Sequence, residues 1–335
     1  MKDFFGRTID YLRLSVTDRC NLRCVYCMPE QGVTWMPHAD ILSFEEILRL
    51  IRVMAQLGIA KIKVTGGEAL TRRGLTGLIT ELKQADGIQQ VTLTTNGILL
   101  MEHLDNLIAA GLDALNISLD TLNSETYNRI TRSGGFEQLE SLIRQIRSLP
   151  FPVKINCVPI RGLNDSEITA IAGLAKDYAA AVRFIELMPL GQGSDYELLT
   201  QEETAAEIKK VYGPLAPFPE KLGNGPAVYY SLSGFKGKIG FISPMSHNFC
   251  DTCSRLRLSA AGLLMPCLAC TAGLDLRNML RGNAGFQSKV RSYKGKNVTD
   301  EELSMAIQNL VNQKPRCHSF AAKEQAAREM FRIGG

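Results

Sequence analysis

Short apolar runs alternate with longer amphipathic stretches over the first 190 residues. The short runs are rich in Val, Ile, Leu and Thr, as strands are, and they cover residues 11–17, 61–67, 91–97, 114–120, 153–160 and 181–188. Between them, apolar residues recur at helical spacing after Leu42 and over residues 75–84, 101–110, 136–149 and 165–180. Ser43 and Glu46 have the spacing of a capping box, which predicts the start of the first helix.

Six strand–helix units in succession predict a parallel sheet with right-handed crossovers. A closed barrel of this kind needs eight units, so we expect an α/β fold with a partial (β/α)6 barrel. Functional residues should gather at the carboxyl ends of its strands. Polar and glycine residues do fall there, at 17–20, 65–68, 94–97, 118–120 and 186–188.

The alternation stops after residue 190, and proline and glycine become dense over residues 213–226. This predicts a linker, with the barrel in residues 1–220 and a smaller C-terminal α+β domain in residues 221–335. Within that domain we expect short strands near 227–233 and 237–243 and helices near 274–281 and 299–312. We expect it to close the mouth of the barrel.

Composition excludes several classes of protein. The 335 residues are 45% hydrophobic and 21% charged, with a net charge of only +4, so no general basicity points to nucleic acid or an anionic membrane. No apolar run reaches the length of a membrane span, and the first ten residues have no apolar core of a signal peptide. We expect a cytoplasmic protein.

Three of the nine cysteines, Cys20, Cys24 and Cys27, follow the first strand at the spacing C-x3-C-x2-C. Thiolates at this density suit an iron–sulfur cluster, which four cysteines usually hold. Three would leave one iron open to a small molecule. The alternative is a zinc site that borrows a histidine such as His38, although this spacing is unusual for zinc.

A second group, Cys250, Cys253, Cys267 and Cys270, has the spacing C-x2-C-x13-C-x2-C. The spacing alone favours a four-cysteine zinc site. Cys157 stands apart from both groups, as does Cys317.

Arginines at four positions suit a phosphorylated ligand, because guanidinium groups bind phosphate oxygens in pairs. Arg255 and Arg257 alternate on an extended segment, so their side chains project to the same side. Arg13 lies on the first strand and Arg183 on the sixth. Inside a barrel an unpaired Arg13 would be costly, which favours a ligand-facing role.

The first cysteine motif, with Tyr26 before its last cysteine, resembles the signature of radical S-adenosylmethionine enzymes. "TGGEAL" at 65–70 resembles the Gly-Gly-Glu motif with which these enzymes contact methionine. "CDTCSRLRLS" with Cys267, and the terminal "RIGG", resemble one branch, the GTP 3′,8-cyclase family, which begins molybdenum-cofactor synthesis. The resemblance covers nearly the whole chain.

The resemblance implies two [4Fe–4S] clusters, one on Cys20, Cys24 and Cys27 and one on Cys250, Cys253 and Cys267. It implies that S-adenosylmethionine is bound by Tyr26, Gly67, Glu68, Ser118 and Met188. It implies that GTP is bound by Arg13, Lys63, Thr94, Lys154, Arg255 and Arg257, of which Arg13, Arg255 and Arg257 would be catalytic. The tail, Gly334 and Gly335, would reach the active site. Three positions depart from the family pattern: Ala69 replaces proline, Lys63 replaces arginine, and Cys270 is additional.

The implied reaction starts with reductive cleavage of S-adenosylmethionine to an adenosyl radical, which takes the 3′ hydrogen of GTP. The C3′ radical attacks C8 of guanine, and reduction gives 3′,8-cyclo-7,8-dihydro-GTP. The resemblance also implies an external electron donor and a transient hand-over of the product to cyclic pyranopterin monophosphate synthase. It leaves open whether the protein is a monomer or a homodimer. Two alternatives remain: a peptide-modifying radical enzyme with an auxiliary cluster, and a zinc-ribbon protein that binds nucleic acid through residues 250–270.

Overall fold

The computed structural model describes residues 1–270, 272–282, 298–318, 320 and 330. All six predicted strands are confirmed, and they lie in chain order in a parallel arrangement. They are β1 (Tyr11–Ser15), β2 (Lys61–Thr65), β3 (Gln90–Thr95), β4 (Ala114–Ser118), β5 (Val153–Cys157) and β6 (Ala181–Ile185). Each ends two or three residues before the predicted end, because the last predicted residues belong to loops at the carboxyl ends.

The predicted helices of the barrel are also confirmed. They are α1 (Phe44–Gln56), α2 (Leu75–Gln84), α3 (Leu100–Ala109), α5 (Phe136–Gln145) and α6 (Ile168–Asp177). The capping box of α1 is complete: Glu46 N donates to Ser43 Oγ at 3.2 Å, and Ser43 N donates to Glu46 Oε2 at 2.7 Å. Short 3-10 turns occur at His38–Asp40, Ala69–Thr71, Ile146–Ser148, Asp165–Glu167, Gly191–Asp195 and Cys250–Thr252.

Two helices were not predicted, α4 (Ser124–Thr131) and α7 (Gln201–Tyr212). Helix α7 buries only Thr204 and Ile208, so its sequence has almost no apolar stripe. Its signal is instead a second capping box, formed by Thr200 and Glu203.

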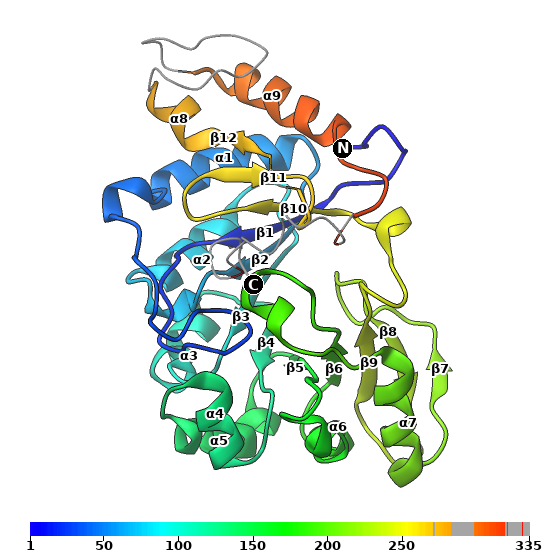
Figure 1. The fold of residues 1–335 in the computed structure, drawn as a ribbon. Coiled ribbons are helices and arrows are strands. Elements are labelled where there is room, and N and C mark those ends of the chain that lie inside the picture. Colours follow the sequence, from blue (N-terminus) through cyan, green and yellow to red (C-terminus); the bar gives the residue numbers. More distant parts are fainter. Residues whose placement is uncertain (271, 283–297, 319, 321–329, 331–335) are drawn as a thin grey trace.

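The C-terminal region lengthens the barrel sheet at both edges (Figure 1). After β6 come β9 (Lys238–Ile242), β8 (Val228–Ser231) and β7 (Ala216–Phe218), and before β1 come β10 (Arg255–Leu258), β11 (Leu263–Met265) and β12 (Leu274–Asp275). Because β9 is parallel to β6 and β10 is parallel to β1, these two strands and the six of the barrel make eight parallel strands in a row. A boundary at residue 220 stays a prediction, since strands on both sides of it share one sheet.

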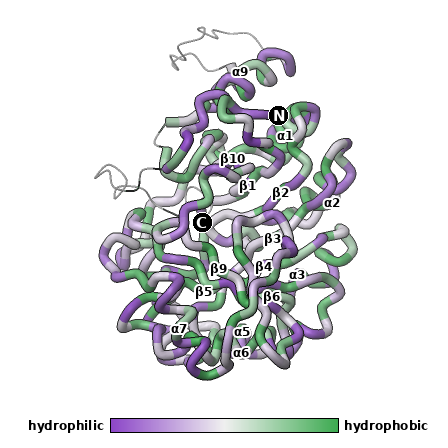
Figure 2. The backbone as a smooth tube through the Cα atoms, turned by 90° about the vertical axis from the view of Figure 1, so that its right-hand side faces the viewer, coloured by the Kyte–Doolittle hydropathy of each residue, from purple (hydrophilic) through white to green (hydrophobic). Residues whose placement is uncertain are grey.

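Helices α8 (Leu276–Arg281) and α9 (Asp300–Asn312) complete the described part, with α9 against α1 (Figure 1). The core lies between the sheet and the surrounding helices, where Leu12, Leu14 and Ile47 are at most 1% exposed. Figure 2 shows hydrophilic stretches on outer helices such as α2 and α9. Alternation along β1 turns Leu12 and Leu14 to this core and leaves Arg13 for the barrel interior. No helix in the described part of the chain has both the length and the apolar character needed to cross a bilayer.

Candidate active site

One cavity of about 320 Å³ runs through the barrel, and all six predicted cluster cysteines line it. Cys20, Cys24 and Cys27 reach it from the loop after β1, at the carboxyl ends of the strands. Cys250 and Cys253 precede β10, and Tyr11 N at the start of β1 donates to Ser254 O at 3.2 Å. Since β10 is parallel to β1, the second group lies at the amino ends. The two thiol groups therefore occupy opposite ends of the cavity.

The segment from the end of β9 at Ile242 to the start of β10 at Arg255 must pass from the carboxyl to the amino ends of the strands. As far as the described residues go, the C-terminal region thus closes the open side of the barrel between β9 and β10. The parallel pairing of β9 and β10 with the barrel edges, which the sequence did not reveal, places it there. Closure of the barrel mouth by this region stays a prediction.

The Gly-Gly-Glu motif packs directly on the first cysteine loop. Gly67 N donates to Thr17 O at 2.8 Å, and Glu68 N donates to Arg19 O at 2.7 Å. A Cβ on Gly67 would lie 2.3 Å from Arg19 O, a distance that no side chain tolerates. Gly67 is therefore required because the two chain segments pack closely. This reason adds to the expected close approach of the backbone to a ligand.

Glu68 is 1% exposed, and its carboxylate is held by three donors. Thr95 Oγ1 donates to Oε1 at 2.9 Å, Leu70 N donates to Oε1 at 3.0 Å, and Asn96 N donates to Oε2 at 2.7 Å. Burial raises the pKa of Glu68, while these hydrogen bonds lower it. Ala69 starts a 3-10 turn capped by Glu68, so the turn forms without the proline that is usual at this position.

The first thiol group is half-buried, and Arg23 lies beside it, with Nη1 donating to Cys20 O at 2.8 Å. Burial raises the pKa of Cys20 to about 11 and that of Cys24 well above its ordinary value, and Cys27 raises the latter further. A bound metal would favour the thiolate form of these cysteines, because its charge balances theirs. Three thiol donors on one loop facing a cavity match the donor set of an iron–sulfur cluster with one open position, so the residues fit the group.

Asp120 is a cavity residue that sequence reasoning did not single out. Tyr26 Oη donates to Asp120 Oδ2 at 2.5 Å, and Val158 N donates to Asp120 Oδ1 at 2.8 Å. The pair fixes Tyr26 beside Cys24 and Cys27. Its only signal in the sequence was its position at the end of a predicted strand.

The second thiol group lies among cations. Lys314, which is 2% exposed, donates to Arg255 O at 2.9 Å and to Pro266 O. Burial acts to raise the pKa of Cys253, but Arg255 and Lys314 outweigh it and the pKa lies below its ordinary value. At Cys253 these cations therefore favour the thiolate, the form that binds a metal.

Cys270 contacts Cys267 without lining the cavity. Its hydrogen bond is the largest cause that lowers the pKa of Cys267 to about 5. At the other edge of this group, burial and then Cys317 raise the pKa of Cys250 to about 11. Within the described residues, no three side chains of His, Cys, Asp or Glu are gathered as a site for a single metal ion.

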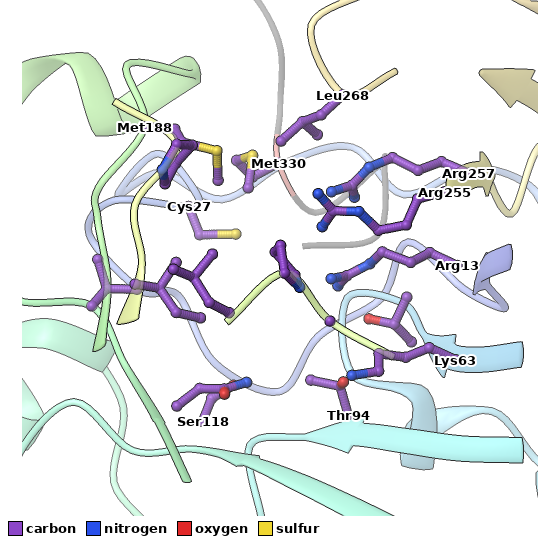
Figure 3. A pocket seen from close by; sticks show the side chains of 18 of the residues that line it. Arg13, Cys27, Lys63, Thr94, Ser118, Met188, Arg255, Arg257, Leu268 and Met330 are labelled. Atoms are coloured by element: carbon purple, nitrogen blue, oxygen red, sulfur yellow. The ribbon is translucent and has the colours of Figure 1, made fainter. Parts of the chain in front are cut away.

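A row of cations crosses three neighbouring strands. Arg13 on β1 is in register with Arg257 on β10 and with Lys63 on β2. The side chains of these three residues and of Arg255 point into the cavity (Figure 3). Burial lowers the pKa of Lys63 well below its ordinary value, and Arg183 and Arg13 lower it further. Like charges opposite one another are unfavourable in a sheet. An anionic ligand would remove this repulsion.

Thr94, Ser118 and Met188 also line the cavity (Figure 3), and their contacts with GTP or S-adenosylmethionine stay predictions. Arg183 lines it as well, with Nε donating to Asn156 Oδ1 at 2.9 Å and Nη2 donating to Asn116 Oδ1. Lys154 is the one predicted site residue in the described part that does not line it. Gly334 and Gly335 lie outside the described residues.

Comparison with known proteins agrees with this geometry. Residues 14–175 match the family model of the radical SAM superfamily, and residues 180–320 match that of Molybdenum Cofactor Synthesis C. The GTP 3′,8-cyclase of Peptoclostridium acidaminophilum is 41% identical over 334 residues, which cover 99% of this chain and 98% of that protein. The GTP 3′,8-cyclase of Moorella thermoacetica is 43% identical over the whole of both chains.

Among solved structures, Streptococcus suis SuiB bound to its precursor peptide SuiA is similar with a TM-score of 0.59 at 12% identity, over 94% of this chain and 72% of that one. SuiB bound to S-adenosylmethionine gives a TM-score of 0.58 at 13% identity, over 78% of this chain and 61% of that one. This likeness concerns the fold alone. The full-length relatives and the two matched family models decide the family: the chain belongs to the GTP 3′,8-cyclase family of radical S-adenosylmethionine proteins.

Proposed function

We propose that this protein converts GTP to 3′,8-cyclo-7,8-dihydro-GTP with the use of S-adenosylmethionine, as the first step of molybdenum-cofactor synthesis. One observation carries the proposal: the row of cations Arg257, Arg13 and Lys63 lines a single cavity, and each end of this cavity has three thiols. A nucleotide between the two sites would have its phosphates within reach of cations and its ribose within reach of the first site.

Cys20, Cys24 and Cys27 would hold the cluster that binds S-adenosylmethionine, and Cys250, Cys253 and Cys267 would hold a second [4Fe–4S] cluster facing guanine. When bound, the first cluster supplies the electron that cleaves S-adenosylmethionine and so starts the radical reaction. The S-adenosylmethionine pocket would be formed by Tyr26, Gly67, Glu68, Ser118 and Met188.

Within that pocket, Glu68 has the clearest task. An ionised carboxylate offers about four acceptor positions, and three are filled by Thr95, Leu70 and Asn96. The remaining one can accept from the amino group of S-adenosylmethionine, while the three donors keep the carboxylate from rotating. The hydrogen bond from Tyr26 to Asp120 likewise keeps the ring beside the cysteines.

Arg13, Arg255, Arg257, Lys63, Thr94 and Lys154 would bind GTP. Each charge-assisted hydrogen bond from such a cation to phosphate contributes about 1.5–3 kcal/mol. The guanidinium groups would orient the ribose as well as neutralise the phosphates, since a rigid fork fixes direction. A cavity enclosed by the sheet and the C-terminal segments would exclude water from the radical steps.

A second bound cluster, an external electron donor, a hand-over to cyclic pyranopterin monophosphate synthase and a cytoplasmic location stay predictions from the sequence. Whether the protein is a monomer or a homodimer stays open.

The test is anaerobic incubation of the reconstituted protein with S-adenosylmethionine, dithionite and either GTP or ATP. We expect 5′-deoxyadenosine in proportion to GTP consumed, and a product that is an isomer of GTP, because C3′ loses one hydrogen and the purine gains one. ATP should give little of either. Equal 5′-deoxyadenosine with GTP, with ATP and without nucleotide would contradict the proposed substrate.

A further inference from the structure

The loop of residues 222–226, between β7 and β8, belongs to the wall of the cavity. Asn224 Nδ2 donates to Oε1 of Gln90, the first residue of β3. Gly225 and Pro226 line the cavity. Because parallel strands begin at the same end of a sheet, contact with the start of β3 places the loop at the amino ends. A segment that the sequence presented as a linker is thus part of the site.

The loop lies against two cations. A Cβ on Gly223 would lie 2.7 Å from Lys154 Nζ, and the φ of Gly223 is +103°, so glycine is required for the chain to pass the ammonium group. A Cβ on Gly225 would lie 3.9 Å from Arg183 Nη1, in ordinary contact. Asn156 and Asn116 hold the Arg183 side chain in place. Lys154 and Arg183 therefore meet the same loop.

Backbone groups of the loop are available as well. In the described part of the chain, the N–H groups of Gly223 and Gly225 donate to no other residue. Free backbone N–H groups beside two cations are the chemistry that binds phosphate oxygens.

The direction of a bound nucleotide follows from the strand order. The second thiol site adjoins β10 and β1, whereas Lys154 and Arg183 stand on β5 and β6, several strands further round the barrel. A nucleotide with its base at that thiol site would extend its phosphates toward these cations and the loop.

We infer that residues 222–226 form the end wall of the polyphosphate subsite, with Gly225 against the terminal phosphate, and so select a nucleoside triphosphate over shorter nucleotides. The inference rests on the proposed function and adds to it a determinant of phosphate-chain length. Gly225 is the residue to change, since its Cβ would fit against the protein yet take space from the terminal phosphate.

The experiment measures the dissociation constants of GTP, GDP and GMP for the reconstituted enzyme by anaerobic calorimetry. In Gly225→Ala we expect GTP to bind roughly tenfold more weakly, the effect of one methyl group too many in a fitted pocket. The dissociation constant of GDP should change less, and that of GMP least. Gly77→Ala is the matched control, because a Cβ at Gly77 meets no atom within 4 Å, and its three affinities should equal those of the wild type.

Asn224→Ala supplies a second test, because it frees the loop from Gln90. It should reduce the ratio of the GDP to the GTP dissociation constant and leave the dissociation constant of GMP unchanged. Thermal melts and iron content verify that each variant is folded. If the wild type prefers GTP and both variants alter all three affinities equally, or alter none, the end-wall inference is wrong and the proposed function stands. If the wild type binds no guanine nucleotide, the proposed function itself fails.

Discussion

Replacing Arg7 by methionine should destabilise the protein and empty the second thiol site of iron. Arg7 is 8% exposed, and its Nε donates to the buried carboxylate of Asp3 at 2.6 Å. Its Nη1 donates to Cys250 O at 2.8 Å, within the second thiol group. The same guanidinium also donates to the carbonyl groups of Lys314, Pro315 and Arg316. One buried cation thus joins the amino end of the chain, the thiol loop and the segment after α9.

The magnitude follows from these contacts. Removal of one partner of a buried ion pair costs about 3–5 kcal/mol. Asp3 Oδ1 keeps two backbone donors, Phe5 N at 3.0 Å and the backbone N of residue 7 at 2.9 Å, so we take the lower half of that range, about 3–4 kcal/mol. A domain's total stability is roughly 5–15 kcal/mol, so Arg7→Met should fold but be much weakened. Asp3→Asn in the same chain should recover part of the loss.

The assay is anaerobic urea unfolding followed by circular dichroism, with iron counted on the same samples. Arg7→Met should lose about half its iron, because two clusters of four irons would share the total and only the second adjoins Arg7. Arg49→Met is the control: its ion pair with Asp300 is exposed, so it should cost under about 1 kcal/mol. An Arg7→Met protein with wild-type stability and full iron content would refute this role for Arg7.

Three further outcomes are expected. Burial, and then Arg183, lowers the pKa of Lys154 to about 8. Because the amine must be protonated to pair with phosphate, GTP binding should weaken above pH 8. This group can weaken it by at most about tenfold per pH unit. Anaerobic calorimetry from pH 7 to 9.5 should show a shallower fall in Lys154→Arg, and an identical fall would exclude Lys154 from binding. Gly67→Ala should abolish S-adenosylmethionine binding in equilibrium dialysis, because its Cβ would meet Arg19 O at 2.3 Å; undiminished binding would contradict the described contact. Cys270→Ser should keep its iron while Cys267→Ser loses about four irons; equal losses would make Cys270 a ligand.

The barrel could be predicted because its signals are local. Short apolar runs mark β1 to β6, and the apolar stripe of α1 follows its capping box. Helix α7 was missed because Thr204 and Ile208 are its only buried residues. The places of β9 and β10 could not be predicted, because the pairing of segments distant in sequence depends on tertiary packing and leaves no local pattern.

Site residues could be predicted where they belong to a recognisable motif in the sequence. Spacing pointed to Cys20, Cys24 and Cys27 as a cluster site, whereas for the second cysteine group it favoured a zinc site. The resemblance supplied the choice of Cys250, Cys253 and Cys267, and with it Glu68, Thr94, Ser118 and Met188. Lys314 and Arg7 were missed, since a buried cation and a solvated one look alike in a sequence. Asp120 was missed as a partner of Tyr26 because the two are 94 residues apart. The close packing that makes Gly67 necessary likewise became visible only when both loops were placed together.

The central claim is that one cavity holds two iron–sulfur sites, each on three cysteines. The most direct measurement is the iron, sulfide and zinc content of the protein purified without oxygen. The account predicts about eight iron and eight sulfide per chain with negligible zinc, the content of two four-iron clusters. About four iron with one zinc would contradict it, because Cys270 would then complete a closed structural site and the site proposed for guanine would be lost.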